Sequence, residues 1–69
     1  MPLNERIKRR REEIGLSQYA LANRLKILNQ SQISKIESGE RGISAKDLIL
    51  LSKALNVPIS ELLDEEEIT

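Results

Sequence analysis

The chain has 69 residues and carries 11 basic and 11 acidic side chains, so its formal net charge at pH 7 is zero. Cysteine and histidine are both absent, which excludes disulfides, thiol catalysis and the usual zinc sites. No apolar run approaches the roughly 18 residues of a membrane span, and the N-terminus lacks the apolar stretch of a secretory signal. We therefore expect one small, soluble, cytoplasmic domain without a metal, a cofactor or a membrane contact.

The charges are distributed unevenly along the chain. Residues 1–41 carry nine basic and five acidic side chains, a balance of +4, whereas residues 42–69 carry two and six, a balance of −4. Asp64 to Glu67 are consecutive acids, and residues 64–69 are expected to form a solvated, frayed tail. A metal site in this run is the alternative, but a calcium loop needs spaced oxygen ligands and a glycine. Because the basic half can face phosphates, overall neutrality argues only weakly against a nucleic-acid partner.

Apolar residues recur at helical spacing and no stretch alternates as a half-buried strand does, which predicts an all-α chain of five short helices. The first helix is predicted over about residues 5–13, with Asn4 as its N-cap and Gly15 after its end. Ser17 then caps a second helix, predicted over about residues 18–25. The residues expected to face the core from these two helices are Leu3, Ile7, Ile14, Leu21, Ala22 and Leu25.

The third helix has the clearest start signal. Residues 26–28 form a short connection to Asn29, whose side chain can cap the helix while the Gln32 side chain bonds back, as in a capping box. This helix is predicted to end before Gly39. Its inward residues are expected to be Ile33 and Ile36.

A glycine-containing loop separates the third helix from two further helices. Ser44, with Asp47 three residues later, begins the fourth, and Asn56 is predicted to end it in a left-handed conformation. Ser60 is predicted to begin the fifth. The apolar stripe of the fourth helix is formed by Leu48, Leu51 and Leu55. A modest exposed patch for dimerisation is expected from Ile59, Leu62, Leu63 and Ile68.

The second and third predicted helices have the arrangement that recognises a DNA major groove, in which a tight turn joins two short helices and the second has a polar leading end. Amide side chains can pair with adenine, and lysine can reach O6 and N7 of guanine. The alternative is that these polar residues are only a solvated helix start. The candidate base-contacting residues are Gln30, Ser31, Gln32, Ser34 and Lys35.

The segments IGLSQYALANRL and NQSQISKIESGER resemble the helix-turn-helix family of the phage lambda and 434 repressors and Cro proteins. The segment KDLILLSKALNVPISELL is similar to the last two helices of that family. The resemblance implies a compact five-helix, lambda-repressor-like domain over residues 1–63. It also implies a transcriptional repressor or regulator that binds double-stranded DNA sequence-specifically, as a homodimer on a palindromic operator.

The resemblance also assigns roles to individual residues. It implies that Gln18 contacts a phosphate and braces Gln30, and that Gln30, Ser31 and Lys35 are the main base-contacting residues. The chain departs from the family in the turn after the second helix, where relatives usually have a glycine. Here residues 26–28 occupy the turn, which is one residue longer.

Arg11 and Glu37 each fall on the inward side of a predicted helix, four residues after Ile7 and Ile33 respectively. Two opposite charges that face one core are most simply explained by a structural ion pair, and the resembling family carries a buried pair at these positions. A phosphate contact for Arg11 is the alternative.

The other predicted phosphate contacts are Arg6, Arg10, Ser38, Arg41 and Tyr19. Lys8 and Arg9 could either lie on a solvated helix face or contact phosphates. Tyr19 could either pack partly buried against the fold or contact a phosphate. No nucleophile and base, metal cluster or glycine-rich phosphate loop can be assembled, so an enzyme is not expected. The alternative function is a protein-interaction or antitoxin-like module with an unknown protein partner.

Overall fold

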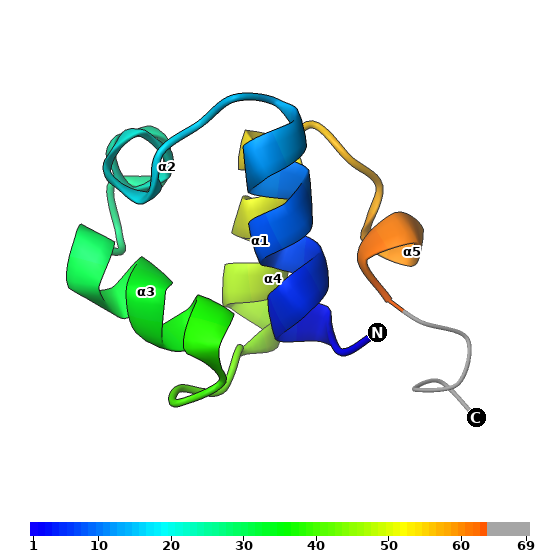
Figure 1. Cartoon of the computed structure of the whole chain (residues 1–69). Helices are drawn as coiled ribbons and strands as arrows, with labels where there is room; N and C mark the ends of the chain where they lie inside the picture. The colour runs from blue at the N-terminus through cyan, green and yellow to red at the C-terminus, as the bar shows by residue number, and fades with distance from the viewer. Residues whose placement is uncertain (64–69) are drawn as a thin grey trace.

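The fold is that of a computed structural model, which describes residues 1–63. The predicted tail at residues 64–69 lies outside the described residues. In the described part the chain forms α1 (Leu3–Glu13), α2 (Gln18–Leu25), α3 (Gln30–Ser38), α4 (Ala45–Ala54) and α5 (Ile59–Leu62) (Figure 1). The all-α prediction is therefore confirmed over residues 1–63. Among these helices, none combines the length and the apolar character that crossing a membrane requires.

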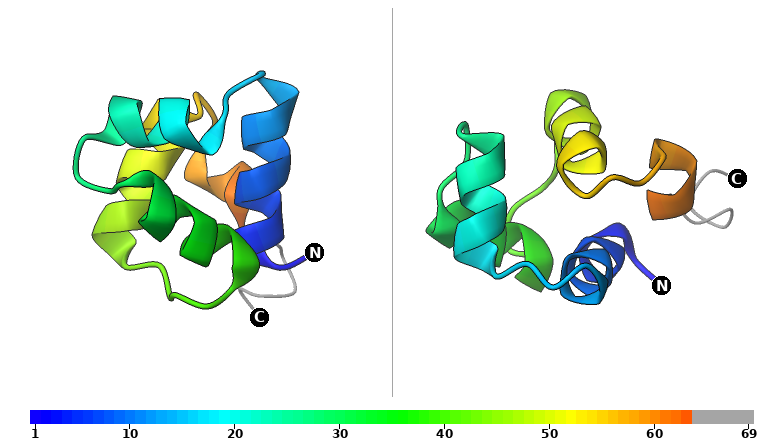
Figure 2. Two further views of the ribbon diagram at one scale, coloured as in Figure 1. Left: turned by 60° about the vertical axis from the view of Figure 1, so that its left-hand side comes forward. Right: turned by 90° about the horizontal axis from the view of Figure 1, so that it is seen from above.

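The five helices follow one another around a closed ring. Each makes its main contacts with two others, in the order α1, α3, α2, α4, α5 and back to α1. The view from above in Figure 2 shows this order, with α2 and α3 on the side of the molecule opposite α5. The pair α2 and α3 is therefore held from one side by α1 and from the other by α4.

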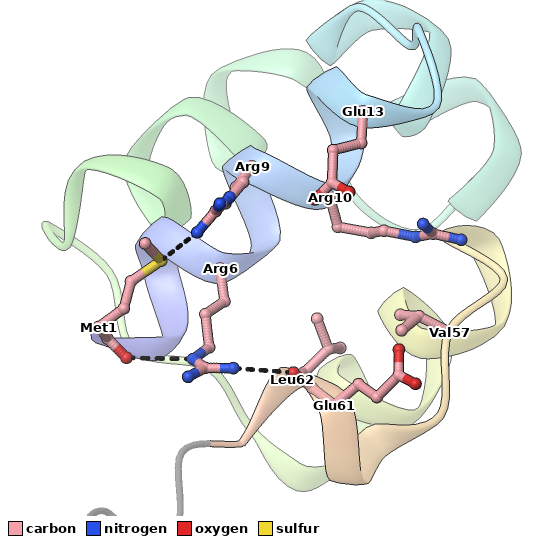
Figure 3. Close-up of a pocket in the computed structure, with 8 residues that line it drawn as sticks. All are labelled: Met1, Arg6, Arg9, Arg10, Glu13, Val57, Glu61 and Leu62. Carbon is pink, nitrogen blue, oxygen red and sulfur yellow. Dashed lines mark hydrogen bonds between the residues drawn. The ribbon is translucent and has the colours of Figure 1, made fainter.

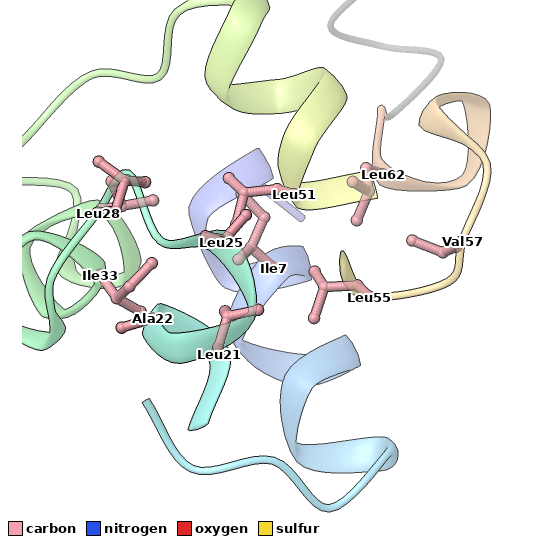
Figure 4. Close-up of a cluster of buried hydrophobic side chains, with 11 residues drawn as sticks. Ile7, Leu21, Ala22, Leu25, Leu28, Ile33, Leu51, Leu55, Val57 and Leu62 are labelled. Carbon is pink, nitrogen blue, oxygen red and sulfur yellow. The ribbon is translucent and has the colours of Figure 1, made fainter. Parts of the chain in front are cut away.

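Every helix contributes to the apolar core inside the ring (Figure 4). The largest fully buried side chains are those of Ile7, Leu21, Ile33, Ile36, Leu51, Leu55 and Leu62. Each such side chain stabilises the fold by about 1.5–3 kcal/mol relative to an exposed one. The single aromatic residue, Tyr19, is 62% exposed, so the apolar part of the core contains no aromatic side chain.

The predicted polar caps of α2, α3 and α4 are confirmed. The Ser17 hydroxyl accepts a hydrogen bond from the backbone N–H of Ala20 at 3.0 Å, and Ser44 caps α4 in the same way. At α3 both halves of the capping box are present, because Asn29 accepts from the N–H of Gln32 at 2.8 Å and the Gln32 side chain accepts from the N–H of Asn29 at 2.9 Å. These local bonds fix where α3 begins.

The predicted start of α1 is wrong. The helix begins at Leu3 behind Pro2, whose carbonyl accepts from the N–H groups of Glu5 and Arg6 at 3.1 Å. Asn4 is inside the helix, and its side-chain amide donates instead to the backbone carbonyl of Glu37 at 3.0 Å. The Asn4 side chain therefore makes a tertiary hydrogen bond and does not cap the helix as the sequence pattern predicted.

The last helix also differs from its prediction. It begins at Ile59, one residue before the predicted Ser60, and its N-cap is Pro58. Leu62 is only 2% exposed and belongs to the core, so its assignment to an exposed dimerisation patch is wrong. Ile59 and Leu63 are half-buried, and Ile68 lies outside the described residues.

The turn after α2 contains one non-glycine residue in the left-handed region. Lys26 ends α2 with φ 64° and ψ −17°, a conformation that favours glycine. Of the two residues that follow, Ile27 is 49% exposed to solvent, whereas Leu28 is buried in the core. Leu28 thus enters the core directly before the capping box at which α3 begins.

Replacing Lys26 with glycine should therefore stabilise the domain. We expect the free energy of unfolding to rise by about 1 kcal/mol in Lys26→Gly, because the left-handed conformation no longer carries a Cβ penalty. Urea denaturation followed by circular dichroism measures this change. The control is Lys53→Gly in α4, which should lower stability by about 0.5–1 kcal/mol. A destabilised Lys26→Gly variant would contradict the assignment of strain to this turn.

Candidate nucleic-acid interface

The outer face of α3 is polar and exposed along its length. Gln30, Ser31, Ser34 and Lys35 are exposed, whereas the apolar side of the helix is buried in the core. Gln32 differs from the other candidates, because it is half-buried and its side-chain oxygen is used in the capping box. The exposed four are therefore better placed than Gln32 to contact a ligand.

Those four side chains border a shallow hollow on the surface of the domain. Its other lining residues are Gln18, from the start of α2, and Glu40, from the loop after α3. The predicted neighbourhood of Gln18 and Gln30 is thus present, but no hydrogen bond joins them. The side-chain amide of Gln18 donates instead to Oε1 of Glu37 at 3.1 Å.

The predicted ion pair between Arg11 and Glu37 is present and buried. Nε and Nη2 of Arg11 donate to the two carboxylate oxygens of Glu37 at 2.7 and 2.9 Å, and Nη1 donates to the carbonyl of Leu16 at 2.8 Å. The two residues are 8% and 6% exposed. The hydrogen bond to Glu37 raises the pKa of Arg11 above its ordinary value, although burial acts in the opposite direction. The pair joins α1 to α3 with a fixed, bidentate geometry.

Lys8 lies beside α3, although its sequence position left this open. It lines a second hollow together with Gln18, Ser34, Glu37 and Ser38. The spacing of residues along α1 is the signal for this position, because Lys8 comes four residues after Asn4 and three before Arg11 and so lies on the same side of the helix. Both of those side chains contact Glu37, so this side of α1 is the one that faces α3.

Arg6 and Arg10 lie on the opposite side of α1, facing α5 (Figure 3). The guanidinium of Arg10 donates to the carbonyls of Leu55 and Asn56 at 3.1 Å, and that of Arg6 donates to the carbonyl of Glu61 at 3.0 Å. These carbonyls lie at the ends of α4 and α5, where cations are favourable. The structure therefore does not bring Arg6 and Arg10 to the α3 face, where their predicted phosphate contacts would fit.

The remaining predicted phosphate contacts lie on or near the α3 face. Arg41 is half-buried, with Nη2 3.7 Å from Oδ2 of Asp47, and Ser38 is exposed with its hydroxyl donating to the carbonyl of Lys35 at 3.1 Å. Both roles stay predictions. Within residues 1–63, no cluster of acidic side chains is suited to hold a metal ion.

Tyr19 projects from the outer face of α2 rather than packing in the core. It is 62% exposed, so the packing role considered for it is wrong. With Asn23 and Lys26 it borders an open groove that reaches Gln30 and Ser31 at the start of α3. Its phosphate contact stays a prediction, on a surface continuous with the exposed end of α3.

Two short helices with a tight connection, and a second helix with an exposed polar face, define the helix-turn-helix class. The helix-turn-helix family model matches residues 7–62, and the chain belongs to this family. No match was found among the curated proteins.

Solved structures match the same fold. The chain is 31% identical to the restriction-modification controller protein C.AhdI of Aeromonas hydrophila, with a TM-score of 0.83 over 88% of this chain and 87% of that one. It is 31% identical to the P22 c2 repressor in complex with a synthetic operator, with a TM-score of 0.82 over 93% and 96% of the two chains. The P22 c2 DNA-binding domain in solution gives 30% identity and a TM-score of 0.86, over 96% and 86%. The lambda-repressor-like fold is thereby established.

The buried ion pair gives a prediction for stability. We expect Arg11→Met to lower the free energy of unfolding by about 3–5 kcal/mol, because Glu37 would be left as an unpaired buried charge. Removing both charges in Arg11→Met/Glu37→Leu should recover most of that loss. Denaturation of the two variants and the parent chain measures both effects. An Arg11→Met variant as stable as the parent would contradict the structural role of the pair.

The position of Arg10 gives a second prediction. We expect Arg10→Met to lower the free energy of unfolding by about 1–3 kcal/mol, because two backbone carbonyls lose a charged donor. The control is Arg9→Met, since Arg9 is exposed and donates to no backbone carbonyl, its hydrogen bond being to the sulfur of Met1 at 4.0 Å. Thermal and urea denaturation compare the variants. Unchanged stability with a weaker salt dependence of DNA binding would instead make Arg10 a phosphate contact.

Proposed function

We propose that the chain is a sequence-specific DNA-binding regulator of transcription, of the repressor type, that inserts α3 into the major groove of double-stranded DNA. The observation that carries this proposal is the exposed polar side of α3, whose opposite side is anchored by Ile33 and Ile36. Membership of the helix-turn-helix family supports it, as does the similarity to a repressor solved with a synthetic operator.

The α3 face offers both kinds of contact that DNA recognition needs. Gln30 can pair with an adenine edge and Lys35 can reach guanine, which would give sequence selectivity. Lys8 and Gln18 line hollows on this face, and the backbone N–H of Arg41 bonds to the carbonyl of Lys35. Phosphate contacts from these three residues would fix the position of the domain on the duplex. Affinity should therefore fall as salt increases.

A homodimer on a palindromic operator is part of the proposal. One α3 helix contacts only a few base pairs, and two copies related by a twofold axis would place their α3 helices in successive major grooves, about 34 Å apart. The half-buried Ile59 and Leu63 on the α5 side are the remaining apolar candidates for the contact between copies.

Selection from a random pool of duplex DNA tests the function. We expect an enriched site with two inverted half-sites about one helical turn apart, and fluorescence anisotropy should show tighter binding to it than to scrambled DNA. No enrichment at any salt concentration would overturn the proposal. A stoichiometric protein partner combined with no DNA binding would favour the protein-interaction alternative.

The α3 contacts give a prediction for specificity. Replacing both Gln30 and Lys35 with alanine should reduce discrimination between the selected site and scrambled DNA by at least about tenfold, because each bidentate base contact is worth about 1–3 kcal/mol. Anisotropy titrations of both duplexes measure this ratio. The control Lys53→Ala removes an exposed cation from α4 and should leave the ratio unchanged. Retained discrimination in the double variant would exclude α3 as the base-contacting helix.

A further inference from the structure

Glu40 is an acidic residue on the face proposed for DNA. It lies in the loop directly after α3 and lines the hollow that also contains Gln30, Ser34 and Lys35. The backbone N–H of Arg41 donates to the carbonyl of Lys35 at 3.2 Å, which folds this loop back against the end of α3. Glu40 is therefore held next to the candidate base-contacting residues.

The charge of Glu40 is not absorbed by a neighbour. Among residues 1–63, the ion pairs join Arg11 to Glu37 and Arg41 to Asp47, and neither Glu40 nor Lys35 takes part in one. The remaining lining residues of the hollow are uncharged amides and hydroxyls. The charged lining residues are thus one cation, Lys35, and one anion, Glu40, so the hollow that would face the polyanionic duplex has no net positive charge.

A carboxylate at this place acts differently toward different DNA atoms. It is repelled by phosphates and by the acceptor edges O6 and N7 of guanine and O4 of thymine, because it has no hydrogen to donate when ionised. It can accept a hydrogen bond only from the amino group of cytosine or adenine in the major groove. At a given position the side chain therefore tolerates two of the four bases and is repelled by the other two.

We propose that Glu40 is a specificity-determining residue that acts mainly by repulsion, an inference that rests on the proposed function of the α3 face. Its carboxylate weakens binding to unrelated DNA and permits tight binding only where a cytosine or adenine amino group faces it. Discrimination by an unfavourable contact with the wrong partner is a general route to specificity. Because the charges of Lys35 and Glu40 cancel, the hollow attracts unrelated DNA less strongly than a positively charged surface would.

The test compares Glu40→Gln with a matched control, Glu13→Gln. Both variants remove one exposed carboxylate and change the net charge equally, but Glu13 lines the groove between α1 and α5, on the other side of α1 from α3. Binding of each variant to scrambled duplex DNA and to the selected site is measured by anisotropy at two salt concentrations. Each variant is also used to select sites from a random pool.

For Glu40→Gln we expect binding to scrambled DNA to tighten about threefold at low salt, with a smaller change at high salt, as removal of one repulsive charge predicts. One base position of the selected site should lose its preference for cytosine or adenine, because an amide can donate as well as accept. Glu13→Gln should change neither. Equal effects of the two variants, or no effect of Glu40→Gln, would overturn the role of Glu40.

The experiment also separates this inference from the proposed function. If the parent chain enriches a site but Glu40→Gln selects the same site with the same discrimination, only the role of Glu40 fails. If the parent chain enriches no site, the proposed DNA-binding function itself fails.

Discussion

The buried pair of Arg11 and Glu37 is the interaction that sets the orientation of α3. Burying two charges is costly unless their hydrogen-bonding groups are satisfied, and here the guanidinium bonds to both carboxylate oxygens and to the carbonyl of Leu16. The same carboxylate accepts from Gln18 at the start of α2. Apolar contacts alone tolerate sliding between helices, whereas these directional bonds define one arrangement of α1, α2 and α3.

The side of α1 on which a basic residue lies decides its role. Lys8 and Arg11 are on the side of α3, where the first borders the candidate interface and the second orients it. Arg6 and Arg10 are on the side of α5, where they bond to carbonyls at helix ends. The basic excess of the first 41 residues is therefore only partly available to DNA, because some of its cations stabilise the fold.

Most features that depend on neighbouring residues could be predicted from the sequence, whereas most that depend on distant residues could not. The capping box at Asn29 and the left-handed Asn56, with φ 53°, are local and were predicted correctly. Two hydrogen bonds join residues far apart in the sequence: Asn4 donates to the carbonyl of Glu37, 33 positions away, and Arg10 donates to that of Leu55, 45 positions away. Predicting them requires knowledge of the tertiary packing. The Arg11 and Glu37 pair was predictable because both charges interrupt apolar stripes. The presence of Lys26 where relatives have glycine indicated an unusual turn, but it did not indicate that Lys26 itself adopts the left-handed conformation.

The closed ring of helices has a consequence for how the domain forms. Arg6 in α1 and Glu61 in α5 are 55 positions apart, so the ring closes only when the first and last described helices meet. The α2 and α3 pair contributes only part of the core, and Leu51, Leu55 and Leu62 complete it from later in the chain. The apolar support beneath the exposed end of α3 is therefore complete only when residues from early and late in the chain have packed together.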